Sequence, residues 1–184
     1  MAVRAGDAAT AGRGRSAAGA RDVALALGRI AVGAYWLYEQ HWKLPPDFGL
    51  HQPRGLLFAF EQGIEHPTLG VYATFLRDVV VPHFHLFGWL LFAGEVTIGT
   101  SLALGVFTKA GAALGTLPAA NLLVAMASTP EGPWIYVAIL AANVAALATP
   151  CNRRLSLDRL LATRLGAAAA RGNTLARVAR ALAS

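Results

Sequence analysis

Apolar stretches separated by more polar segments dominate the hydrophobic pattern of this chain. The most apolar one runs from Leu86 to Phe107, 22 residues that include a single ionisable side chain, Glu95. A helix of this length extends about 33 Å, which is enough to cross a hydrocarbon core of about 30 Å. A carboxylate at the centre of a bilayer costs about 2.5–3.5 kcal/mol, so its presence indicates a partner or a function.

The same pattern predicts an all-α membrane protein, a bundle of four transmembrane helices. The predicted spans are residues 23–42, 84–107, 110–128 and 134–151. Each span is bounded by charged residues, prolines or glycines, which interrupt the apolar periodicity.

The segments between and around the spans have different predicted roles. A long outer loop, residues 43–82, is divided by prolines into two short amphipathic helices, 54–64 and 68–81, which we expect to lie over one mouth of the bundle. Residues 1–22 are mostly Ala, Gly and Arg, a composition that favours disorder. Residues 153–184 are predicted to form a basic cytoplasmic tail.

Composition and charge support a membrane location. Apolar residues make up 55% of the chain and charged residues 14%, whereas a soluble domain usually has about 25% charged residues. The net charge of +6 comes from arginines gathered at the two ends beside apolar segments, which favours a membrane surface with lipid as partner over nucleic acid. The positive-inside rule then predicts a multi-pass protein of the plasma membrane with both termini in the cytoplasm.

The first span has one polar face. At 100° per residue, this face contains Arg29, Gly33, Trp36, Gln40 and Lys43. On an otherwise apolar helix such a face is expected to point into the bundle.

Counting residues along each span gives the depth of the candidate functional side chains. Glu95, Asn121 and Trp36 lie near mid-span, and Arg29 lies about two turns from the cytoplasmic face, within reach of Glu95. We predict that Arg29 and Glu95 form an ion pair, that Glu95 relays protons catalytically, and that Arg29, Trp36 and Asn121 bind a ligand. The alternative is that the polar groups only join helices and that Trp36 is a core aromatic.

Redox and metal motifs do not accompany these residues. A lone cysteine, Cys151, excludes an internal disulfide or a CxxC pair. His83 and His85 would diverge by about 200° on a helix, so they cannot share a ligand there, and no metal site is predicted.

Three sequence elements resemble a known family. The first is an early arginine in the first span followed by a Lys-Leu-x-Pro exit at Lys43 and Pro46. The second is a Pro-rich outer loop that leads into the segment around Gly94-Glu95, which continues to Gly105 and Thr108. The third is R-x-L-S-L-D, from Arg153 to Asp158. Over residues 24–162 the chain is similar to the DoxX/DoxD family of four-span membrane proteins.

The resemblance implies a function that the residues alone do not. Some members are the membrane subunit of thiosulfate:quinone oxidoreductase, so it implies a redox subunit that passes electrons from a sulfur substrate such as thiosulfate to the quinone pool. Quinone is then the expected cofactor, and a second redox subunit is a possible partner. The alternative is a non-catalytic scaffold or anchor for a redox enzyme complex. A small-solute transporter is disfavoured because the chain shows no inverted repeat.

Overall fold

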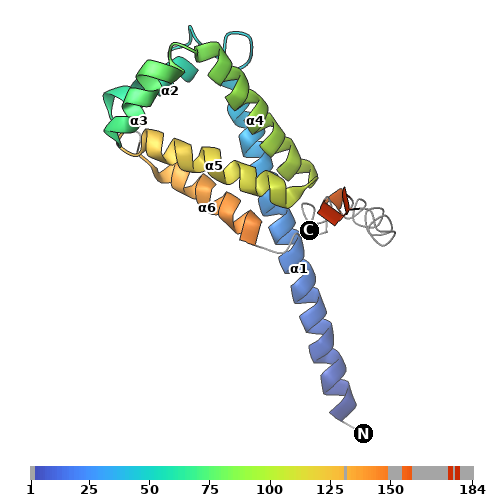
Figure 1. Ribbon diagram of the computed structural model, residues 1–184. Coiled ribbons are helices and arrows are strands. Elements are labelled where there is room, and N and C mark those ends of the chain that lie inside the picture. Colours follow the sequence, from blue (N-terminus) through green and yellow to red (C-terminus); the bar gives the residue numbers. More distant parts are fainter. Residues whose placement is uncertain (1–2, 131, 149–154, 159–173, 176, 179–184) are drawn as a thin grey trace.

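The computed structural model describes residues 3–130, 132–148, 155–158, 174–175 and 177–178, and the regular structure among them is helical (Figure 1). An all-helical protein was predicted, and this is confirmed. Most of residues 153–184, the predicted basic tail, lies outside the described residues.

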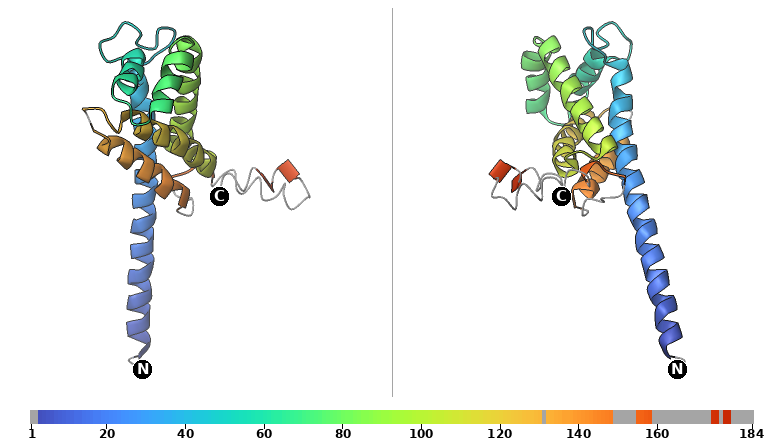
Figure 2. Two further views of the ribbon diagram at one scale, coloured as in Figure 1. Left: turned by 60° about the vertical axis from the view of Figure 1, so that its left-hand side comes forward. Right: turned by 90° about the vertical axis from the view of Figure 1, so that its right-hand side faces the viewer.

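Helix α1, Val3–Tyr38, is 36 residues long. The helix therefore includes all but the first two residues of the segment 1–22, whose composition favours disorder. Alanine has the highest helix propensity of all residues, and the alanines of this segment extend the helix back from the apolar part. The N-terminal half of α1 projects beyond the other helices (Figure 2).

The polar face of α1 points inward as predicted. Arg29, Gly33, Trp36, Gln40 and Lys43 are all buried. Glycine at position 33 is required by the packing of α1 on α4, because a Cβ there would lie 2.4 Å from the backbone nitrogen of Ala103. The chain then tightens into a 3₁₀ turn, η1, Glu39–Trp42.

Helices α4, Phe84–Leu104, and α5, Thr108–Met126, are both long and apolar enough to cross a membrane. Only 28% of the most apolar window of α4 and 33% of that of α5 is buried within the protein, so most of their apolar surface faces outward. That pattern is expected of helices in contact with lipid. Helix α6, Trp134–Ala148, lies beside α5 (Figure 1).

The outer loop contains the short helices that its prolines predicted. They are α2, Leu56–Glu65, and α3, Gly70–Phe75, which continues into one π-helical turn, η2, Leu76–Val80. They cover one end of α4 and α5, as predicted (Figure 1). Before α2, the buried Phe48 ring packs directly on Gly88, where a Cβ would lie 2.7 Å from the ring.

The turn between α4 and α5 is held by the segment after α6. Gly105 ends α4 with a φ of 67°, and the buried Asp158 carboxylate caps α5. Its Oδ1 accepts from the Phe107 N–H at 2.8 Å, and its Oδ2 accepts from the Thr108 N–H at 3.0 Å and the Thr108 hydroxyl at 2.7 Å.

Candidate functional site

Glu95 lies at the centre of the candidate site and is 3% exposed. Its Oε2 lies 2.5 Å from the Lys43 ammonium and accepts a hydrogen bond of 2.6 Å from the Gln40 side-chain amide. Lys43 is also buried, at 5%. A buried pair in which each charge offsets the other is stable only while both partners are present, because either one alone would be stranded away from water.

The end of α1 determines the geometry of this group. The Gln40 amide also donates to the Trp36 carbonyl one turn earlier, at 3.1 Å, which fixes its side chain. The 3₁₀ turn then brings Lys43 onto the same side of the chain, with its ammonium 4.6 Å from the centre of the Trp42 ring. The cation–π contact and the carboxylate together hold the Lys43 ammonium in place.

The predicted Arg29–Glu95 ion pair is wrong. The Arg29 guanidinium instead donates to the carbonyls of Leu102 and Leu155, the second at 2.7 Å. Leu102 lies two turns beyond Glu95 on α4, about 10 Å along the axis. The prediction failed because Arg29 lies level with Leu102, whereas the end of α1, at Gln40 and Lys43, lies level with Glu95.

Trp36 and Asn121, both predicted as ligand-binding residues, lie together with Glu95 around one enclosed cavity of about 80 Å³. The Asn121 side-chain oxygen accepts a hydrogen bond of 3.0 Å from the Tyr72 hydroxyl of α3. The cavity is therefore enclosed by α1, α4, α5 and α6 and covered in part by α2 and α3. Arg29 does not line this cavity.

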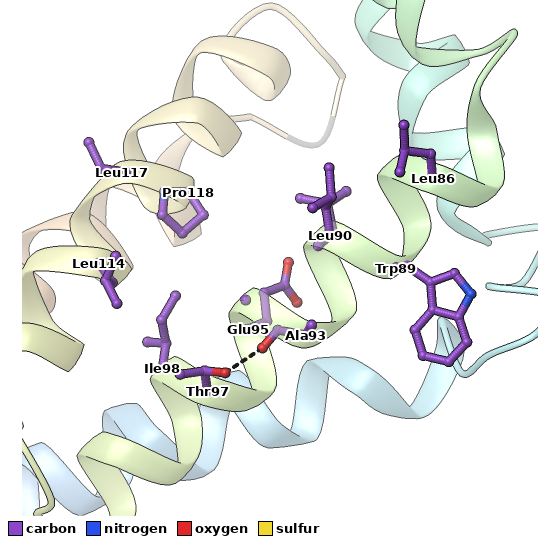
Figure 3. Close-up of a pocket in the computed structure, with 12 residues that line it drawn as sticks. Leu86, Trp89, Leu90, Ala93, Glu95, Thr97, Ile98, Leu114, Leu117 and Pro118 are labelled. Atoms are coloured by element: carbon purple, nitrogen blue, oxygen red, sulfur yellow. Dashed lines mark hydrogen bonds between the residues drawn. The ribbon is translucent and has the colours of Figure 1, made fainter.

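A second and larger space lies between α4 and α5, an open apolar groove of about 700 Å³. In Figure 3, Leu114 and Pro118 of α5 lie across the groove from Leu90 and Ile98 of α4, whereas Trp89 projects to another side of α4. Glu95 is the one ionisable residue among those that line the groove. The groove and the enclosed cavity share three lining residues, Leu91, Glu95 and Pro118, so Glu95 lies in the wall between them.

The groove continues along the same two helices past Thr97 and Leu114. A further apolar pocket of about 630 Å³ shares these two residues and extends to Phe107. Together the two pockets follow most of the length of α4.

Sequence reasoning placed Gln40 and Lys43 on the inward face of α1 without recognising them as partners of Glu95. The available signal was the spacing of Trp36, Gln40 and Lys43, which continues one helical face to the end of the span. Extending this face to Lys43 places a cation at the same level as Glu95. Among the residues that the structure describes, no group of three or more His, Cys, Asp or Glu side chains is placed to hold a metal ion. Cys151 lies outside them.

Comparisons with known proteins add no relative. No family model matches the chain, and neither the curated proteins nor the solved structures include a match. The fold and the site thus define a helical protein with two helices able to cross a membrane and a buried Lys–Glu pair beside an apolar groove. The resemblance to the DoxX/DoxD family remains a prediction from sequence.

Proposed function

We propose that this chain is an integral membrane redox subunit similar to the DoxX/DoxD proteins, which passes electrons from a sulfur substrate such as thiosulfate to the quinone pool. The observation that supports a quinone most directly is the position of Glu95. It is the one ionisable side chain in the wall of an apolar groove that is open along two membrane-competent helices. A quinone combines a polar head that needs protons with an apolar tail that needs such a groove.

The dimensions of the groove fit this ligand class. Its part near Glu95, about 700 Å³, lies within the range of 300–1,000 Å³ that is typical of small-molecule sites. Its continuation toward Phe107 offers apolar surface for a tail. The exposed leucines of the groove, Leu86, Leu90 and Leu117, are 58%, 58% and 70% exposed and leave it open to lipid.

The chain's own residues have distinct roles in this proposal. Leu114 and Leu117 of α5 and Leu90 of α4 hold the ring and tail and exclude water. A bound quinone would supply a two-electron acceptor that takes up two protons when it is reduced to the quinol. The Lys43–Glu95 pair holds a transferable proton next to the groove, on the Lys43 ammonium, and Gln40 fixes the carboxylate by donating to its Oε2.

The proposed topology has four crossings, with α1, α4, α5 and α6 as spans and both termini in the cytoplasm. The arginine bias supports this orientation, and it places the outer loop with α2 and α3 on the far side of the membrane. Reporter fusions at residues 60, 109, 131 and 184 should indicate outside, inside, outside and inside. A fusion at residue 184 that indicates the outside would contradict the orientation.

The groove is tested by a substitution that fills it without disturbing the fold. A Cβ on Gly94 meets nothing within 4 Å, so Gly94→Leu projects into open groove space. Gly28→Leu is the matched control, because Gly28 also has nothing within 4 Å of its Cβ but lies on the exposed side of α1. The measurement is quenching of tryptophan fluorescence by a short-tailed quinone analogue in purified protein.

Wild-type protein and Gly28→Leu should bind the analogue, and Gly94→Leu should not. Thiosulfate-dependent reduction of the analogue, measured with and without co-purified proteins, then tests the activity itself. Binding that is equal in all three proteins would exclude the groove as the quinone site. Binding without any reduction, even with co-purified proteins, would favour the scaffold alternative.

A further inference from the structure

The enclosed cavity beside Glu95 has a mainly apolar wall that carries several polar side chains. Besides Glu95, its ionisable and hydroxyl-bearing lining residues are Tyr35, Glu39, Lys43, Tyr72 and Tyr136. The cavity of about 80 Å³ exceeds the roughly 10–15 Å³ that one water molecule needs, and these side chains offer the water hydrogen-bond partners. Water is therefore the natural occupant of this space.

An unsatisfied donor in the wall supports this occupant. Trp36 is 1% exposed, and among the described residues its indole N–H has no hydrogen-bond partner. The same is true of the Gln40 side-chain oxygen, one helical turn away, on the amide that donates to Glu95. Buried donors and acceptors are satisfied by protein or by ordered water in the great majority of cases.

The cavity lies between the membrane groove and a surface pocket. On one side it shares Glu95 with the groove. On the other it shares Trp42, Ala59, Met126 and Tyr136 with a pocket of about 120 Å³. The lining of that pocket includes the exposed Arg54, so the three spaces follow one another from the outer-loop surface to the groove.

We propose that the cavity holds ordered water and is the route by which protons pass between the outer-loop surface and Glu95. The Trp36 indole N–H donates to a cavity water, and the water chain reaches the carboxylates of Glu39 and Glu95. A proton that leaves the Lys43–Glu95 pair toward the groove is replaced by one from the cavity water, which in turn takes one from the surface pocket. No net charge accumulates. This proposal rests on the proposed function only in taking a quinone in the groove as the final acceptor of the proton.

The wall between the surface pocket and the cavity offers a way to block the route. Ala59 lines both spaces and lies on α2, far along the chain from Glu95. Ala59→Leu adds volume at this point, and Ala59→Val adds less, should the larger substitution prevent folding. Ala34→Leu is the matched control, since Ala34 is exposed on α1.

The measurement is hydrogen exchange of the Trp36 indole N–H, followed by NMR in protein labelled with ¹⁵N-tryptophan. The chain contains four tryptophans, so the indole signals can be assigned by single substitutions to phenylalanine. We expect a water cross-peak at the Trp36 indole and exchange with D₂O despite its burial. Ala59→Leu should slow this exchange at least about tenfold, since exchange then requires local opening of the wall. Ala34→Leu should not change it.

A Trp36 indole N–H without a water cross-peak, or one whose exchange is the same in wild type, Ala59→Leu and Ala59→Val, would overturn the proposal. The result is separable from the quinone assay. Ala59→Leu should retain binding of the quinone analogue, whereas Gly94→Leu should lose it with unchanged exchange at Trp36. Failure of quinone binding in wild type would refute the proposed function and leave the water route to be decided by the exchange data.

Discussion

Among the residues that the structure describes, two carboxylates are almost fully buried, and their surroundings differ. Asp158 is 2% exposed and accepts from two backbone N–H groups and one hydroxyl at the start of α5, where the helix dipole also favours a negative charge. Glu95 is 3% exposed, but both of its partners are side chains, the Lys43 ammonium and the Gln40 amide. Space adjoins Glu95 on two sides.

The difference separates a structural carboxylate from a candidate functional one. The donors of Asp158 are mainly backbone groups, which cannot give up a proton, so Asp158 can cap and position but not relay. One donor of Glu95, Lys43, is an ionisable side chain, and the Glu95 carboxyl group borders both an enclosed cavity and an apolar groove. Burial alone therefore does not identify function; the kind of donor and the adjoining space do.

The largest expected effect is a loss of protein stability when one partner of the Lys43–Glu95 pair is removed. Lys43→Met leaves the Glu95 charge buried without a cation and should lower the free energy of unfolding by about 3–5 kcal/mol. Replacing both residues, Lys43→Met with Glu95→Leu, should cost less than either single change. Unfolding in mixed micelles with increasing denaturing detergent measures these differences.

The control is a second double-mutant cycle, on Arg29 and Glu95. Because these two residues bind different partners, their effects should add to within about 0.5 kcal/mol. Additivity for Lys43 and Glu95 together with coupling for Arg29 and Glu95 would contradict the site described here.

The next effect concerns turnover. Replacing the pair by two glutamines, Lys43→Gln with Glu95→Gln, keeps hydrogen-bonding groups at both positions and removes both charges and the transferable proton. We expect this variant to fold and to bind the quinone analogue, and to reduce it at least about a hundredfold more slowly, as is typical when an acid–base group is lost. Unchanged turnover, or loss of the fold alone, would assign a structural role to Glu95 as well.

Asp158→Ala should have a smaller effect, and on stability only. Loss of the cap and of its hydrogen bonds to Phe107 and Thr108 should cost about 1–3 kcal/mol. Asp158→Asn should cost less, because its one side-chain oxygen can still accept at the start of α5. Thermal unfolding measures both, and binding of the quinone analogue is expected to remain; a loss of binding in folded Asp158→Asn would remove the contrast with Glu95.

The sequence was sufficient to predict some parts of this arrangement but not others. The helical class, the inward face of α1 and the two helices of the outer loop followed from periodicity and prolines. The partner of Glu95 did not, because it depends on the crossing of α1 and α4 at Gly33 and Gly99, which sets which residues share a level. The cap by Asp158 also depends on a contact between segments 50 residues apart, Thr108 and Asp158, which no local pattern encodes.

The smallest expected effect tests the roof over the cavity at Glu95. Tyr72→Phe removes the hydrogen bond to Asn121 and should cost about 1 kcal/mol. Burial also raises the pKa of the Tyr72 hydroxyl, so the folded protein keeps a proton that the unfolded chain releases near pH ~10. The stability linked to this proton is fully present below that pH and is lost as the pH rises through the raised pKa of the folded state. The unfolding free energy of wild type should therefore fall more steeply above pH ~10 than that of Tyr72→Phe. Parallel pH profiles would show that Tyr72 is open to solvent and that the outer loop does not seal the cavity.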